Sequence, residues 1–279
     1  MSTGALIPSS PKKSGCEDYY HAFKRQDGSL DTESIENDLG QIETKIDRVY
    51  EAIRMRRPLT ALEWRAFHVF AGSMTVRVPK FIQTFHDFAS EVLEYGFEIM
   101  KTQPEFVKRS QELGVPPEVL ANTNARADRD FSLLMCLSAM ETPIKLFSRM
   151  NWQFLDASAG NHFITGDNPV FYCAPDRKPS LFPPGLADQD IEVTFPLSGK
   201  TCAVAAWRPS KVIYGEVDGK TVQLVNARTK AGAARFLYGP QKNFFEPLLN
   251  QPIKPSVKRS FMLEAQLRDC ARLNQDEGD

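Results

Sequence analysis

The sequence has no long hydrophobic run and only five cysteines in 279 residues. No apolar stretch approaches the roughly 20 residues that a membrane-spanning helix needs, so we expect no membrane segment. The cysteines lie far apart, with no C-x-x-C pair and no histidine at ligand spacing, which excludes an ordinary zinc knuckle. Their odd number and the absence of a secretory signal favour reduced thiols, and we expect a cytoplasmic protein.

An excess of charge of one sign is also missing. The net charge is −1 and the sequence pI is about 6.5, which argues against a strongly basic nucleic-acid-binding domain. The sequence contains no HExxH, GxSxG, P-loop or GxGxxG pattern, so no reaction class follows from a motif. Partners therefore stay unknown. No cofactor is indicated either, although a divalent metal is compatible with the acidic candidates below.

Residues 31–150 carry helical periodicity. Apolar residues at alternating steps of four and three predict a first helix over 33–56, ended by Pro58. Thr60 and Glu63 form a capping-box pattern that begins a second helix, which stops before Pro79. Further helices are expected at about 104–113 and 128–150, the latter kinked at Pro143. The helix after Pro79 places Phe81, Phe85, Phe88, Val92 and Tyr95 on one face, and we expect the three phenylalanines in the core.

After Asn151 the pattern changes to short β-branched and aromatic runs, typical of strands. Candidate strands are 152–157, 162–165, 191–195, 201–207, 211–217 and 220–225. Asp218-Gly219 between the last two predicts a hairpin turn, and Asn226 could cap a helix to about Tyr238. Helices followed by strands predict an α+β fold, with a helical half at 31–150 packed on an antiparallel sheet at 151–240. We expect a single domain over 31–250, a disordered arm at 1–30, and a tail at 251–279 with one helix.

Several segments resemble a family of unknown function, DUF4238. They are Ile35 to Glu43, Thr75 to Pro79, Trp152 before a small turn, the octapeptide Phe163 to Val170, and Pro196-Leu197-Ser198. The octapeptide Phe-Ile-Thr-Gly-Asp-Asn-Pro-Val is the most specific part, and the likeness covers roughly residues 31–240. The sequence lacks the His-Tyr-x-Pro opening that is usual in the family, and Gly166 stands where the family has Ser. The resemblance implies no established activity.

Asp167 and Asn168 are the first candidate site residues. A carboxylate and an amide at the end of a buried strand could bind a metal, a phosphate or a polar substrate. The alternative is an Asx turn, in which the side chains accept from nearby backbone amides and Pro169 fixes the exit. We favour the structural turn, in which Asp167→Asn should cost under roughly 1 kcal/mol.

Glu36 and Glu43 are the second set, with Asp47 on the same flank of the first helix. Carboxylates at this spacing could bind a divalent cation together with Asp167, or do acid–base work. The alternative is a solvated helix face. Arg77 could bind a phosphate or carboxylate of a substrate. It could equally pair with Glu36 or Glu43 and join two helices, which we favour.

The sequence leaves three hypotheses for function. The first is a non-catalytic binding or regulatory module. The second is a metal-assisted hydrolase or nuclease that uses Asp167, Asn168, Glu36 and Glu43. The third is an effector of a defence-like system that acts through the arm or the tail. An enzyme would need Asp167 close to Glu36, Glu43 or Arg77 in an open cleft.

Overall fold

The computed structural model describes residues 7–9, 20–25, 27–175, 177 and 184–245, and the expected tail helix lies outside these residues. The helical half contains seven helices. They are α1 (Ser34–Arg54), α2 (Ala61–Val76), α3 (Pro79–Lys101), α4 (Pro104–Glu112), α5 (Pro117–Asn122), α6 (Arg129–Ser138) and α7 (Glu141–Phe147). The predicted capping box is present: the Glu63 amide donates to Thr60 Oγ1 (3.3 Å), and the Thr60 amide donates to Glu63 Oε2 (2.8 Å).

The predicted helix over 128–150 is divided into α6 and α7. The division lies at Ala139 and Met140 and not at Pro143. Pro143 falls in the first turn of α7, where a missing backbone N–H costs nothing because those amides have no intrahelical acceptor.

The main sheet contains five strands in the order β5-β6-β7-β3-β8. These are β3 (Asn151–Ala157), β5 (Phe171–Cys173), β6 (Glu192–Pro196), β7 (Thr201–Ala206) and β8 (Tyr214–Val217). All pairs are antiparallel except β3–β8, which is parallel. The chain reverses direction between β7 and β8, but β3 already occupies the place beside β7, so β8 pairs with β3 instead. The α+β prediction is confirmed, with a mixed sheet in place of a purely antiparallel one.

The predicted strand 220–225 and its hairpin turn are wrong, because this segment belongs to α8 (Gly219–Gly232). Asp218 is the N-cap: its Oδ1 accepts from the Thr221 amide at 3.0 Å. Asn226 lies inside α8 and caps nothing. The predicted strand 162–165 is reduced to β4 (Thr165–Gly166), which pairs with β9 (Leu237–Tyr238). A short 3-10 helix, η1, follows at Lys242–Phe244.

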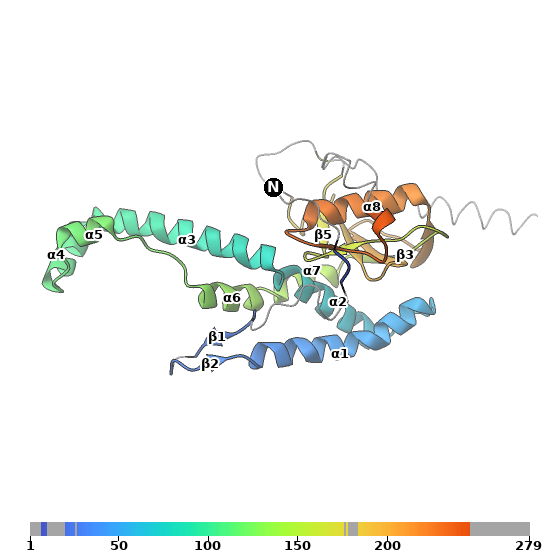
Figure 1. Cartoon of the computed structure of the whole chain (residues 1–279), viewed down its shortest axis with the longest axis horizontal. Helices are drawn as coiled ribbons and strands as arrows, with labels where there is room; N and C mark the ends of the chain where they lie inside the picture. The colour runs from blue at the N-terminus through green and yellow to red at the C-terminus, as the bar shows by residue number, and fades with distance from the viewer. Residues whose placement is uncertain (1–6, 10–19, 26, 176, 178–183, 246–279) are drawn as a thin grey trace, which may run out of the picture.

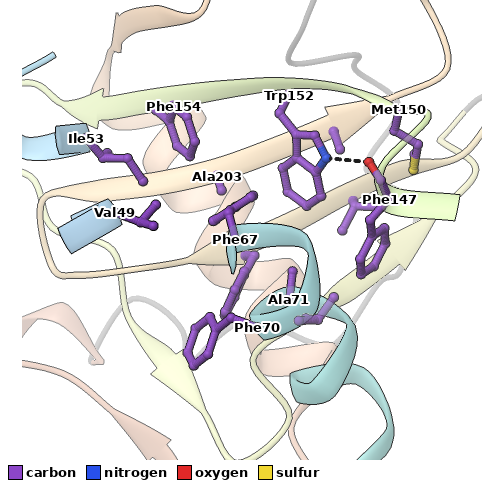
Figure 2. Close-up of a cluster of buried hydrophobic side chains, with 14 of the residues drawn as sticks. Val49, Ile53, Phe67, Phe70, Ala71, Phe147, Met150, Trp152, Phe154 and Ala203 are labelled. Atoms are coloured by element: carbon purple, nitrogen blue, oxygen red, sulfur yellow. Dashed lines mark hydrogen bonds between the residues drawn. The ribbon is translucent and has the colours of Figure 1, made fainter. Parts of the chain in front are cut away.

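The two faces of the sheet are covered by different helices (Figure 1). On one face Trp152, Phe154 and Phe195 pack against α1, α2 and α7. Figure 2 shows the centre of this core, where the Trp152 ring meets the Phe67 ring edge-on and Trp152 Nε1 donates to the Phe147 carbonyl at 2.9 Å. On the other face Leu155, Cys202 and Val204 pack against Val222 and Val225 of α8. The sheet is therefore the middle of three layers.

The segment 20–31 lies beside α6. The strands β1 (Phe23–Lys24) and β2 (Leu30–Asp31) form a small antiparallel pair. Arg129 donates to the backbone carbonyls of Tyr20 and Ala22, and Phe23 packs against the cluster of Ile82, Leu133 and Cys136. The expected boundary of the arm at residue 30 thus falls inside this pair of strands. Within the described residues no helix is both long and apolar enough to cross a membrane.

The helix α3 leads away from the sheet and carries α4 and α5 at its far end (Figure 1). Its near half packs on α6, with Ile82 buried and Phe81 and Phe85 partly buried. Farther along, Phe88, Val92 and Tyr95 are 62%, 54% and 72% exposed. The expectation that Phe88 lies in the core is therefore wrong, because the body of the protein ends before the helix does.

Candidate functional site

The octapeptide Phe163–Val170 runs between the sheet and the C-terminal end of α8. Phe163, Ile164 and Val170 are buried in three different clusters of the core. Asn226 of α8 holds the start of the segment, because its Oδ1 accepts from the Ile164 amide and its Nδ2 donates to the His162 carbonyl, both at 2.9 Å. The polar turn thus follows a stretch of chain that is fixed to α8.

Both carboxylate oxygens of Asp167 accept hydrogen bonds from the backbone that follows α8. Oδ1 accepts from the amide of Ala234 at 2.8 Å. Oδ2 accepts from the amides of Arg235 and Phe236 at 2.7 and 3.1 Å. The Asp167 amide in turn donates to the Phe236 carbonyl at 3.1 Å. Asp167 is therefore an anion held in a nest of backbone donors supplied by residues 234–236.

Asn168 and Lys80 meet at the last carbonyl of α8. The Asn168 Nδ2 and the Lys80 Nζ each donate to the Gly232 carbonyl oxygen at 3.0 Å. Carbonyls at a helix C-terminus lack intrahelical donors, and a cation there is favoured by the helix dipole. These contacts tie three parts of the chain together: the octapeptide, α8 and the start of α3.

Gly166 permits the close approach of this turn to the strand β9. A Cβ atom at this position would lie 3.1 Å from the Phe236 carbonyl oxygen and 3.2 Å from Ala233 Cβ. Both contacts are tight, and one of them is to backbone. A serine here, which the resemblance implies as usual, would require the 233–236 segment to move away by a few tenths of an ångström.

Arg77 and Glu43 join α2 to α1. The Arg77 guanidinium donates to Glu43 Oε1 at 2.8 Å and contacts the Met74 sulfur at 2.8 and 3.1 Å. Its side chain is only 14% exposed, and it lies 6.0 Å from the centre of the Phe70 ring. Burial, helped by the charge of nearby Asp47, raises the pKa of the neighbouring Tyr50 to about 12. The favoured ion pair between Arg77 and Glu43 is thus present.

Glu36 lies about two turns before Glu43 on α1 and has a different partner. Its Oε1 is 2.6 Å from His21 Nδ1, in the segment before β1. Gly40 lies between Glu36 and Glu43 and faces open space: among the described residues, no atom outside the adjacent helix backbone lies within 4 Å of where a Cβ would be. The flank of α1 that sequence marks as acidic therefore holds two separate pairs, one to the N-terminal segment and one to α2.

The structure gives the candidate carboxylates separate partners. Asp167 binds the backbone of 234–236, Glu43 binds Arg77, and Glu36 binds His21. Across the residues that the structure describes, no group of three or more His, Cys, Asp and Glu side chains could hold a metal ion.

A family model described as DUF4238, protein of unknown function, matches residues 2–243. The chain belongs to the DUF4238 family. No curated protein and no solved structure matches it. The matched range begins well before residue 31 and so includes the β1–β2 pair and His21, which the sequence resemblance left out.

This DUF4238 protein also contains a buried ion pair that the sequence patterns did not predict. Arg228 of α8 donates through both terminal nitrogens to Glu192 Oε2 of β6, each at 3.2 Å. The two side chains are 2% and 5% exposed. A glutamate between Ile191 and Val193, inside an apolar strand, was the available signal, since buried charges in proteins are paired.

Proposed function

We propose that this DUF4238 protein is a non-catalytic binding or regulatory module in which the Gly166-Asp167-Asn168-Pro169 turn is structural. The observation that carries the proposal is the use of both Asp167 oxygens by three backbone amides. The Asp167 oxygens are occupied by these amides, so a metal or a substrate would have to compete with them for the carboxylate. These amides belong to the segment between α8 and β9, so their bonds to Asp167 hold that segment on the turn.

The other candidate side chains support the same proposal. Glu43 and Arg77 are engaged with each other, and Glu36 is engaged with His21. The helical half and the sheet share one buried core, which supports a single cooperative unit over residues 31–250. The cysteines Cys136, Cys173 and Cys202 are free thiols, which supports a cytoplasmic location.

The experiment is a thermal-shift screen of wild type, Asp167→Asn and Asp167→Ala against divalent metals and nucleotides. We expect no metal-dependent shift for any of them. Asp167→Ala should lower the melting temperature most, because three amides lose their acceptor. Asp167→Asn should fall between, because its amide nitrogen would face one of the backbone N–H groups. We therefore expect Asp167→Asn to lose more stability than the value of under roughly 1 kcal/mol expected for an ordinary turn.

Asp38→Asn is the matched control, because Asp38 is exposed on α1 and the same charge is removed there. It should leave the melting temperature within experimental error. The opposite result is a metal that stabilises wild type but not Asp167→Asn, while the metal-free fold of that variant survives. Such a result would favour the second hypothesis, a metal-assisted hydrolase or nuclease, over the binding module.

A further inference from the structure

An exposed apolar stripe runs along the far half of α3. Phe88, Val92, Tyr95 and Ile99 recur at steps of four, three and four, which places them on one face of the helix. Their exposed fractions are 62%, 54%, 72% and 46%. Large apolar side chains in a continuous row on a surface mark a place where another molecule binds.

In the far half of α3, three described contacts are made by the face opposite the stripe. The Ser90 hydroxyl accepts from the Ala127 amide at 3.2 Å, and the Phe97 ring packs 5.9 Å from that of Phe106. Lys101 Nζ donates to the Ala121 carbonyl at 3.2 Å. At 3.6 residues per turn, these side chains lie about 150–170° around the helix axis from the centre of the stripe. The far half of α3 therefore uses one face to hold α4, α5 and the segment before α6, and turns the stripe outward.

Charge is distributed unevenly beside the stripe. Glu91 and Glu98 are exposed along one edge, with Asp87 farther round on the same side. The other edge has the small residues Ala89 and Gly96. In the described part of the chain, no atom outside the adjacent helix backbone lies within 4 Å of where a Cβ of residue 96 would be. Lys101 pairs with Glu98 at 2.7 Å, but Glu91 and Asp87 add to an acidic margin. The stripe thus has apolar side chains for a partner to pack on. The edge with small residues lets a partner helix approach closely, and the acidic edge attracts positive charge.

We propose that this stripe binds an amphipathic helix of a partner protein that carries Lys or Arg along one side of its apolar face. The inference rests on the proposed function, because it gives the binding module its partner and its surface. Charge complementarity selects this occupant. A second copy of the chain would bring the same acidic margin, so antiparallel pairing through the stripe would set Glu91 and Glu98 against themselves.

The test uses the full chain and two synthetic helical peptides of 21 residues. Both have Leu at the apolar positions of three heptads; one has Lys and the other Glu at the flanking positions. Fluorescence anisotropy should show the Lys peptide binding at least tenfold more tightly than the Glu peptide, with a preference that shrinks as salt rises. Phe88→Ser and Tyr95→Ser should each weaken the Lys peptide at least tenfold. Leu62→Ser is the control, since Leu62 is 78% exposed on α2 and away from the stripe.

The decisive variant reverses the charge of the acidic edge beside the stripe. Glu91→Lys/Glu98→Lys should make the chain prefer the Glu peptide. Equal affinity for both peptides, no reversal in this variant, or an equal loss in Leu62→Ser would overturn the proposal. So would light scattering that shows a wild-type dimer abolished by Tyr95→Ser, since the occupant would then be a second copy. A failed peptide assay beside a metal-silent Asp167 screen would refute this partner and leave the non-catalytic module standing.

Discussion

Removing one residue of the buried pair Glu192–Arg228 should lower stability more than replacing both residues together. Arg228 approaches from α8 and Glu192 stands on β6, so the pair crosses the interface between the helix and the sheet. Both side chains are nearly inaccessible to water. Glu192→Leu removes the carboxylate that faces the buried Arg228 guanidinium, and Arg228→Met removes the guanidinium that faces the buried Glu192 carboxylate.

The magnitude follows from this burial. Removing one partner of a buried pair costs about 3–5 kcal/mol, because the remaining charge stays shielded from water and loses its attraction to the opposite charge. Replacing both by apolar residues of similar size removes the two desolvation penalties together. We therefore expect each single variant to lose about 3–5 kcal/mol, and Glu192→Leu/Arg228→Met to lose far less than their sum, under about 2 kcal/mol.

Equilibrium unfolding in urea, followed by circular dichroism, measures the four free energies of this double-mutant cycle. The denaturant slope should stay unchanged, which would show that the variants alter stability and not the extent of unfolding. Single variants that lose under about 1 kcal/mol would refute the reasoning, because the pair would then be accessible to water. Losses that simply add in the double variant would refute it as well, since the two charges would not be interacting.

Two further predictions concern the core between the sheet and the helices α1 and α2. Ile46 is 3% exposed in the main cluster, so Ile46→Ala should lower the free energy of unfolding by about 2–5 kcal/mol, and a loss well under 1 kcal/mol in urea unfolding would place this stripe outside the core. His68 lies between the rings of Trp64 and Trp152, and burial lowers its pKa from 6.5 to about 4. The unfolded chain binds this proton more strongly, so stability is lost as pH falls from about 6.5 towards 4. Between pH 7 and 5 the loss is about 2 kcal/mol, and His68→Phe should remove it; an unchanged pH dependence in the variant would contradict the assignment.

The helical half could be predicted from the sequence because its signals are local. Pro58, the Thr60–Glu63 capping box and the four-three apolar spacing each act within a few residues, and α1 and α2 begin and end close to the predicted places. The same spacing on α3 was misleading. Periodicity shows that a helix has an apolar face but not whether the body of the protein is long enough to cover it.

The error at α8 has a different origin. Asp218-Gly219 is favourable both as a hairpin turn and as a helix start, and Val222 and Val225 are favourable in strands. The choice is made by β8, whose partner is β3, some 60 residues earlier in the chain. Once β8 is paired there, a hairpin strand would have no apolar surface to cover, whereas a helix can bury Val222 and Val225 on the open face of the sheet.

The candidate site shows the same division between local and distant information. The octapeptide that carries the family resemblance could be recognised from its residues, but its partners lie more than 60 residues farther on, mostly in the backbone. Backbone donors leave no trace in a sequence pattern, so an Asp that holds a loop and an Asp that holds a metal look alike. The two cases differ in the groups that surround the carboxylate in the folded protein. Here the end of α8 leaves amides and a carbonyl to be satisfied, and Asp167, Asn168 and Lys80 supply an acceptor and two donors. The proposed structural role of the octapeptide is to hold the end of α8 against the sheet. The surface proposed to bind a partner lies instead on α3, where exposed apolar side chains have no such partner among the described residues.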